Sequence, residues 1–158
     1  MLKTIKAKLS RSDILQGILE KHLHPTGEIA YIKTKSGKES WFDMDGHLIH
    51  RKTATDEEFR DYDKSGVLRR LHKVGRYEVL YNEKGLREHK ININGIEEFW
   101  EYDQNNQLYK WSNTKGHERR YVCGESGKIT AWFCNEALIS WYEQTGRKFD
   151  HNFAGLMF

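Results

Sequence analysis

The stretch Phe42-Asp43-Met44-Asp45-Gly46-His47-Leu48 decides the fold of this chain, because it specifies a tight hairpin. Asp at its start and Gly near its end suit a type I turn followed by a left-handed residue, which together form a three-residue hairpin loop with a bulge. This loop places Phe42 directly opposite Leu48 on the two flanking strands. The stretch therefore predicts an antiparallel hairpin with a fixed register.

The same pattern returns along the chain with a period of about 20 residues. In one copy Asn106 replaces Gly, and Asn tolerates a positive φ better than other non-glycine residues. A second set of turns, at Gly37, Gly75, Gly95 and Gly116, lies between the copies, so each period holds two strands. The clear further copies are Tyr62–Leu68 and Tyr102–Leu108, and the weaker ones are Leu23–Ile29, Tyr81–Gly85, Cys123–Ile129 and Tyr142–Gly146.

The turn geometry also predicts which residues face each other across the strands. Outside the Phe42 and Leu48 pair, regular pairing would set Trp41 against Ile49 and, further out, Glu39 against Arg51. In the other copies we expect Tyr62 opposite Leu68, Tyr102 opposite Leu108, Cys123 opposite Ile129, Leu23 opposite Ile29 and Asp61 opposite Arg69.

These hairpins predict a mainly β fold, an antiparallel meander of repeats that extends from about residue 28 to 149. About twelve strands exceed what an open twisted sheet usually carries, so we expect a curled or folded-over sheet. Ahead of it, Ser10 or Ser12 begins a short helix whose apolar residues continue to Leu19 and which ends near His22.

We expect one domain over residues 1–158, within which three segments differ in character. Residues 1–24 form a helical cap, residues 25–149 form the hairpin repeats, and residues 150–158 form an apolar tail. The tail either caps the end of the sheet or docks on another chain.

Composition narrows the class of protein. Aromatic residues make up 13% of the chain against 37% for all hydrophobic residues, so burial must come largely from aromatic rings. No apolar run approaches the length of a membrane span and the first ten residues lack a signal-peptide core, so we expect a cytoplasmic protein that does not contact membranes. Cys123 and Cys134 lack a C-x-x-C spacing and are expected to be reduced structural thiols.

Motifs for catalysis, metal binding and cofactor binding are missing from the sequence. The histidines show no zinc spacing, since His47 and His50 point to opposite faces of a strand. The glycines belong to hairpins and form no phosphate-binding loop. Asp43 and Asp45 are explained by turn capping. We therefore expect no catalytic residue, no metal, no cofactor and no enzymatic activity.

Cations alternate with aromatic residues over the middle and later part of the chain. Tryptophan, tyrosine and arginine dominate the hot spots of protein interfaces, and they also stack bases and neutralise phosphates in single-strand binders. Core packing is the third interpretation, since alternation sets Trp100 on the face of Tyr102 and Trp111 on the face of Phe99. The candidate partner-binding residues are Arg69, Arg70, Arg76, Trp100, Tyr109, Trp111, Arg119, Arg120 and Trp132.

The tandem Tyr-Asp-x-x-Gly-x-Leu units, best represented around Trp100-Glu101-Tyr102-Asp103, resemble bacterial YD-repeat (RHS-like) sequences and variant MORN-type repeats. The resemblance covers residues 24–149 and implies a repeat scaffold of the kind found in toxin shells, immunity proteins and small phage proteins. It supplies no functional residue.

The expected function is accordingly that of a non-enzymatic protein-binding repeat protein. The resemblance implies an inhibitor or immunity protein of phage or mobile-element type, which neutralises a toxin or a defence nuclease. The alternative is a nucleic-acid-binding module that uses an Arg/Trp-rich sheet face, and a small enzyme with an unrecognised site is the third. A homodimer is compatible with each of them.

Overall fold

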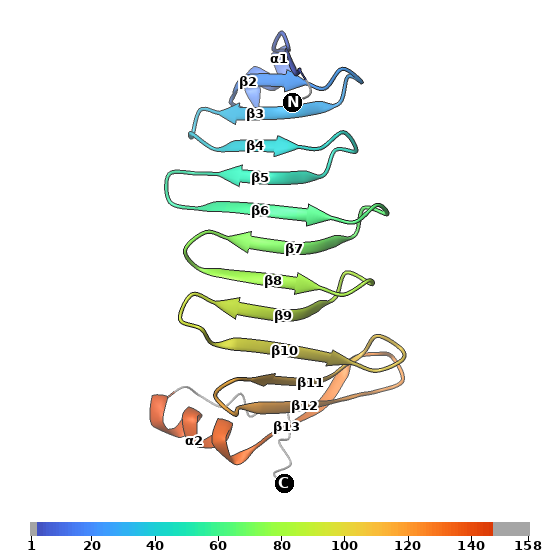
Figure 1. Cartoon of the computed structure of the whole chain (residues 1–158), viewed down its shortest axis with the longest axis vertical. Helices are drawn as coiled ribbons and strands as arrows, with labels where there is room; N and C mark the ends of the chain where they lie inside the picture. Colours follow the sequence, from blue (N-terminus) through green and yellow to red (C-terminus); the bar gives the residue numbers. More distant parts are fainter. Residues whose placement is uncertain (1–2, 147–158) are drawn as a thin grey trace. The chain divides into compact units, whose positions relative to one another are not determined.

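A computed structural model describes residues 3–146 and contains two compact units, Met1–Leu86 and Arg87–Phe158, which we call the N-terminal and the C-terminal unit. Within each unit, every strand is antiparallel to the next strand along the chain, and turns join consecutive strands except the first two, which a short helix separates (Figure 1). The predicted mainly β fold, an antiparallel meander of hairpin repeats, is confirmed. Among the described residues, no helix is both long enough and apolar enough to cross a membrane.

The N-terminal unit begins with a short strand and a short helix and continues as a meander. Its elements are β1 (Ile5–Lys6), α1 (Arg11–Leu15), β2 (Ile18–Leu23), β3 (Ile29–Thr34), β4 (Glu39–Phe42), β5 (Leu48–Lys52), β6 (Glu57–Tyr62), β7 (Leu68–Lys73) and β8 (Tyr77–Tyr81).

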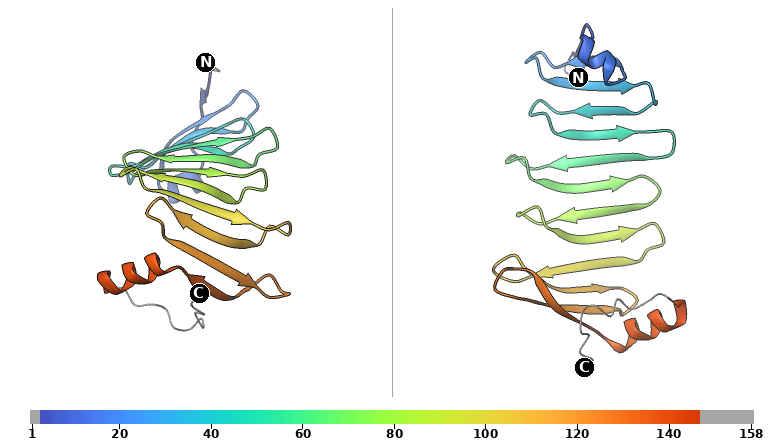
Figure 2. Two further views of the ribbon diagram at one scale, coloured as in Figure 1. Left: turned by 60° about the horizontal axis from the view of Figure 1, so that its bottom comes forward. Right: turned by 180° about the vertical axis from the view of Figure 1, so that it is seen from behind.

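The C-terminal unit has five described strands and ends its described part with a helix, which lies beside the last strands (Figure 2). Its elements are β9 (Arg87–Asn92), β10 (Glu97–Tyr102), β11 (Leu108–Asn113), β12 (Glu118–Cys123), β13 (Ile129–Cys134) and α2 (Glu136–Thr145). The predicted apolar tail lies outside the described residues.

The predicted N-terminal helix exists but is shorter than expected. Ser10 caps it through a capping box with Asp13, as the sequence indicates. The helix ends at Leu15, and Ile18–Leu23 form β2, which pairs with β3. The prediction of a helix through residue 22 was therefore wrong. The apolar residues of this segment also fit a strand, and the hairpin partner β3 supplies the backbone hydrogen bonds that a strand needs.

One of the weaker repeat copies, Tyr142–Gly146, was wrongly predicted as a hairpin. It is the end of α2, which starts after Asn135, whose side chain accepts a hydrogen bond from the Leu138 amide. Gly146 has a φ of 62° and lies just beyond the last turn of the helix. A left-handed glycine ends helices as readily as it completes a hairpin loop, so the same residue fits both structures.

The hairpin turns show why Asp and Asn recur at their first position. The Asp63 Oδ1 atom accepts hydrogen bonds from the Ser65 amide at 2.9 Å and from the Val67 amide at 3.0 Å. Each such side chain thus pairs two amides that the tight loop leaves without a backbone partner. Asp43, Asn82, Asp103 and Asn113 make the same two contacts in their turns.

The tyrosine that precedes this residue connects neighbouring repeats. The Tyr62 hydroxyl donates to the Leu48 carbonyl at 3.1 Å, and the Tyr102 hydroxyl donates to the Arg87 carbonyl at 2.7 Å. Each carbonyl belongs to the first residue of the strand that directly precedes the tyrosine's own strand. The Tyr-Asp pair therefore fixes the turn locally and joins it to the previous hairpin.

The register next to each turn is confirmed, with Phe42 opposite Leu48. The predictions one step further out were wrong by one residue, since Trp41 faces His50 and Glu39 faces Lys52. The pairs Tyr62 with Leu68, Tyr102 with Leu108, Cys123 with Ile129 and Leu23 with Ile29 are confirmed in the same way, whereas Asp61 faces Arg70 in place of Arg69.

A second bulge after the first pair explains this shift. It adds one unpaired residue to the strand that follows the turn, so every later pair moves by one position. The added residues are Ala30, Ile49, Arg69, Tyr109 and Thr130.

Cross-strand side-chain pairs supply much of the packing in the N-terminal unit. On one face, the His50 ring stacks between Trp41 and Phe59, with centroid separations of 4.2 Å on both sides. A row of charges runs beside these rings, in which Lys33 pairs with Glu39 at 2.9 Å. Such pairs are the unit of sheet stabilisation where strands contact mainly their neighbours.

Candidate binding site in the C-terminal unit

The predicted arginines of the N-terminal unit do not gather at one place. Arg69 is the added residue of the β7 bulge. Arg70 forms an ion pair with Glu78 at 2.6 Å, and Arg76 forms one with Asp56 at 3.0 Å. Arg70 is thus neutralised within its own hairpin, and Arg76 is neutralised by an aspartate from the turn between β5 and β6.

The C-terminal unit brings four of the predicted residues together. Trp100 on β10 faces Trp111 on β11, and Trp111 faces Arg119 on β12. The Arg119 guanidinium in turn lies over the ring of Trp132 on β13, 4.5 Å from its centroid. We call the side of the sheet that carries these residues the tryptophan face.

The expectation that Trp111 shares a face with Phe99 was wrong. Phe99 faces Ser112, and Trp111 shares the tryptophan face with Trp100. The cause is the bulge at Tyr109, which shifts the rest of β11 by one residue and so exchanges its two faces.

The other two predicted residues of this unit belong elsewhere. Arg120 pairs across the strands with Lys110 and Phe133, on the side opposite to Arg119, and forms an ion pair with Glu118 at 2.8 Å. The Tyr109 hydroxyl donates to Glu101 at 2.6 Å.

Helix α2 covers part of the tryptophan face and forms a small core with it. Trp132, Cys134 and Leu138 are buried, and Trp132 is only 8% exposed. Trp111 and Tyr142 pack against this cluster and remain partly exposed. Trp132 is therefore a core residue.

Between α2 and strands β10 to β12 lies a cavity of about 490 Å³. Aromatic rings dominate its lining, and two charged side chains from the strands and several polar side chains from the turns complete it. The aromatic lining residues are Trp100, Trp111, Tyr121, Trp141 and Tyr142, and the others are Asn92, Ile96, Glu98, Asn113, Lys115, His117, Arg119 and Leu138.

Glu98 is held by three donors in the cavity wall. Its carboxylate accepts from Lys90 Nζ at 2.9 Å, from Asn92 Nδ2 at 3.0 Å and from the Trp111 indole nitrogen at 3.3 Å. Burial opposes the charged form, but these donors hold the pKa of Glu98 below its usual value. The carboxylate is therefore ionised at neutral pH and its charge is balanced by Lys90.

Arg119 is surrounded differently. Its Nη2 atom donates to the Tyr142 hydroxyl, and its Nε atom is buried with no hydrogen-bond partner. Burial opposes its charge, but the nearby Tyr121 and Tyr142 side chains raise the pKa of the guanidinium. Within residues 3–146, no carboxylate forms an ion pair with Arg119.

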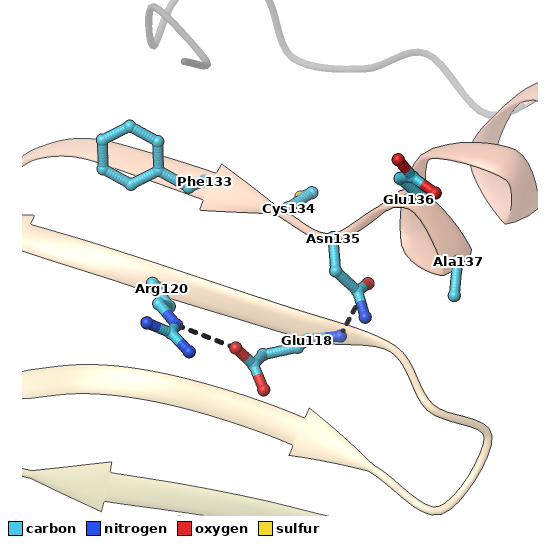
Figure 3. A pocket seen from close by; sticks show the side chains of 7 residues that line it. All are labelled: Glu118, Arg120, Phe133, Cys134, Asn135, Glu136 and Ala137. Atoms are coloured by element: carbon cyan, nitrogen blue, oxygen red, sulfur yellow. Dashed lines mark hydrogen bonds and ion pairs between the residues drawn. The ribbon is translucent and has the colours of Figure 1, made fainter. Parts of the chain in front are cut away.

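A second pocket of about 500 Å³ lies where β13 meets the start of α2 (Figure 3). The Arg120 side chain is paired with Glu118 there, and the Asn135 Oδ1 atom accepts from the Glu118 amide at 3.1 Å. Of the described residues that line it, Phe133 is the one aromatic residue. Because its arginine is already paired with Glu118 and few rings line it, this pocket offers a ligand less than the tryptophan-lined cavity.

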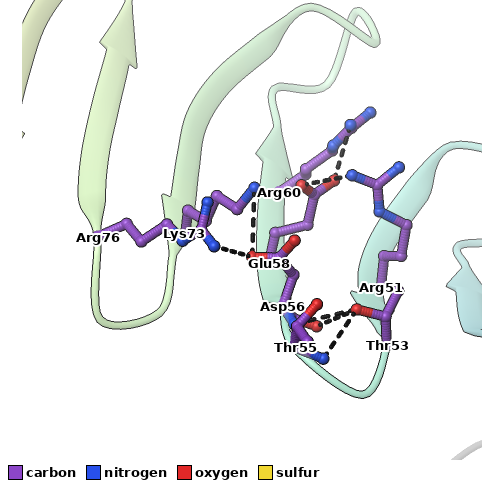
Figure 4. Close-up of polar contacts among 8 residues, drawn as sticks. All are labelled: Arg51, Thr53, Thr55, Asp56, Glu58, Arg60, Lys73 and Arg76. Atoms are coloured by element: carbon purple, nitrogen blue, oxygen red, sulfur yellow. Dashed lines mark hydrogen bonds and ion pairs between the residues drawn. The ribbon is translucent and has the colours of Figure 1, made fainter.

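The N-terminal unit holds a charged cluster that sequence reasoning missed, apart from Arg76 (Figure 4). Glu58 is 6% exposed and accepts from Arg51 and from Arg60, each at 2.8 Å. Beside it, Asp56 pairs with Lys73 at 3.5 Å and with Arg76. The cations exceed the carboxylates in this cluster, which gives the surface a positive charge.

Asp43, Asp45 and His47 also lie close enough together to hold a cation, with ligand atoms within 4.8 Å of one another. The turn itself accounts for this arrangement. Asp43 accepts from the backbone of Asp45 and His47, and the His47 ring contacts Asp43 and stacks on Tyr62 at 4.7 Å.

A scan against models of protein families finds no match for the chain. A search of curated protein sequences finds none either.

Proposed function

We propose that this chain is a non-enzymatic repeat protein that binds another protein through the tryptophan face of its C-terminal unit. The observation that carries the proposal is the cavity beside α2, which is lined by three tryptophans, two tyrosines and an arginine. These residue types contribute most of the binding energy at protein interfaces, where they fill or form central pockets.

The tryptophan rings are held in place before any partner arrives, which supports this proposal. The Trp111 indole donates to Glu98, and the Arg87 guanidinium lies 5.1 Å from the centroid of the Trp100 ring. Rigid aromatic side chains lose little conformational entropy when they are covered, so more of the contact energy is retained as affinity.

The class of partner is proposed from the likeness to YD-repeat sequences. Repeats of that kind serve as scaffolds in immunity-type and phage proteins, so we propose that the partner is a toxin or a defence nuclease that this chain inhibits. A binding mode in which a rigid scaffold presents a preformed cavity suits such stoichiometric inhibition.

Nucleic acid is the second candidate, and the cluster of Arg51, Arg60, Lys73 and Arg76 in the N-terminal unit favours it. A positive surface on a sheet attracts a phosphate backbone. Two carboxylates inside the cluster already compensate part of this charge, and for that reason protein binding is the first proposal.

Affinity capture from host cells with the full chain tests the proposal. Trp100→Ala removes an aromatic ring from the cavity wall. Phe99→Ala is the matched control, because the Phe99 ring is next in sequence, lies on the opposite face of the sheet and is 36% exposed. We expect the same protein to be captured by the parent chain and by Phe99→Ala, and to be lost with Trp100→Ala. Equal capture by all three, or binding to oligonucleotides that weakens steeply with salt, would contradict the proposal.

A further inference from the structure

The cations of the C-terminal unit divide into two kinds. Lys90 pairs with Glu98 at 2.9 Å, Lys110 pairs with Glu101 at 2.7 Å, and Arg120 pairs with Glu118. Arg119, which is more buried than Arg120, has no such partner among the described residues. Arg119 is thus a strand cation of the cavity lining that no carboxylate among the described residues neutralises.

An arginine in this position keeps its charge, because the guanidinium does not lose its proton in proteins. Arg119 is partly buried, and burial of part of a charged group without a counter-charge is unfavourable. The Trp132 ring and the Tyr142 hydroxyl stabilise the cation through a cation–π contact and a hydrogen bond, but neither carries a negative charge. An anion that enters the cavity would remove this unfavourable contribution.

Glu98 does not supply that anion. Its oxygens are occupied by Lys90, Asn92 and Trp111, and Lys90 balances its charge. Aromatic rings next to the guanidinium lower the local polarity, which strengthens an ion pair formed with Arg119. A carboxylate next to an apolar group fits this combination of one guanidinium and several rings.

We propose that the cavity recognises an acidic side chain of the partner protein, whose carboxylate pairs with Arg119 while the rings contact its apolar neighbour. This inference rests on the proposed function and names the chemistry of the contact. A nucleic-acid phosphate suits the cavity less well, because phosphate sites usually combine several cations or backbone amides. Among the described residues, Lys115 is the only other cationic side chain in this lining.

A pair of small probes tests the proposal on the full chain without a known partner. N-acetylphenylalanine carries a ring and a carboxylate, and N-acetylphenylalanine amide has the same ring and no charge. Their binding is followed by NMR through the indole N–H signals of the five tryptophans. We expect the acid to shift the signals of the cavity tryptophans and the amide to bind about tenfold more weakly, as loss of a charge-assisted hydrogen bond predicts.

Arg119→Gln should abolish this preference for the acid. Arg120→Gln is the matched control, since its side chain lies on the opposite side of the sheet, and it should keep the preference. If Arg119→Gln does not fold, the comparison of the two probes on the parent chain still decides the matter. Equal binding of acid and amide, or a preference that survives Arg119→Gln, overturns the inference.

The remaining outcomes separate this inference from the proposed function. A captured protein partner together with no discrimination between the probes overturns the inference alone. Discrimination between the probes without any captured protein overturns the assignment to a protein partner. If a ten-residue thymidine oligonucleotide binds more tightly than the acid and loses this binding with Arg119→Gln, the site is assigned to nucleic acid. That result also overturns the assignment to a protein partner.

Discussion

The guanidinium of Arg119 lies 4.5 Å from the centre of the Trp132 ring. The cation in the cavity wall therefore contacts the buried tryptophan of the tryptophan face. The two residues come from the neighbouring strands β12 and β13, and Trp132 packs in the core with Leu138 of α2. The position of the charge is therefore tied to the core of the C-terminal unit, and a change in that core should disturb both.

Trp132→Ala should be the most destabilising single substitution in this unit. It removes a buried ring and leaves a cavity, for which the typical loss of unfolding free energy is about 3 to 5 kcal/mol. Urea denaturation of the parent chain and the variant measures this loss. Trp100→Ala serves as the comparison, because Trp100 is only partly buried and should lower stability less. Equal losses for the two variants would show that Trp132 is not a core residue.

Gly66→Ala should destabilise its hairpin more than Gly46→Ala. Both glycines have positive φ, at 82° and 85°, so both substitutions add the strain of a left-handed alanine, about 1 to 2 kcal/mol. At Gly66 the added Cβ would also lie 3.0 Å from the His47 ring, whereas the space at Gly46 is open. Thermal denaturation of the two variants tests the difference, and identical melting temperatures would contradict it.

Tyr62→Phe should lower stability by about 1 kcal/mol, because it removes one hydrogen bond to the Leu48 carbonyl and leaves the ring in place. Phe42 occupies the equivalent position in the first clear repeat, so the phenyl ring itself is accommodated by the turn. Equilibrium unfolding in urea measures the effect. No change in stability would mean that the tyrosine hydroxyl does not contribute to the contact between repeats.

The C-terminal unit should lose stability in acid partly through Glu98. Its pKa is lowered in the folded protein, so ionised Glu98 stabilises the fold fully above the unfolded value of about 4.5, and this contribution disappears as the pH falls through the lower folded value. Stability measured from pH 6 to pH 3 should fall more steeply for the parent chain than for Glu98→Gln. His117, whose pKa burial also lowers, is present in both chains and cancels in the comparison.

The sequence predicts the hairpin turns because their chemistry is local. Asp63 and Gly66 stabilise their turn through contacts within the turn itself, independently of the rest of the fold. The pairing of Tyr62 with Leu68 follows directly from this turn. The bulge residues could not be predicted this way, because they share no sequence signal: Ile49 is aliphatic and Arg69 is charged. A bulge depends on the twist of the whole strand pair and not on one residue.

The candidate site was predicted in composition but not in geometry. The interleaved Trp100, Trp111 and Arg119 indicated a binding surface, but the bulge at Tyr109 decides which of them share a face. The cavity itself needs α2, whose sequence ends in the same Gly146 that a hairpin would use. Turn residues report only local structure. They could not indicate that Glu136–Thr145 form a helix, nor that this helix packs on the sheet.

The affinity of the captured protein for the parent chain and for the Trp100→Ala and Phe99→Ala variants tests the central claim most directly. Isothermal titration calorimetry should show a loss of at least about 2 kcal/mol, or about thirtyfold in Kd, for Trp100→Ala, and no more than a few-fold change for Phe99→Ala. The reverse order, with Phe99→Ala the weaker binder, would place the interface on the opposite face and contradict the account.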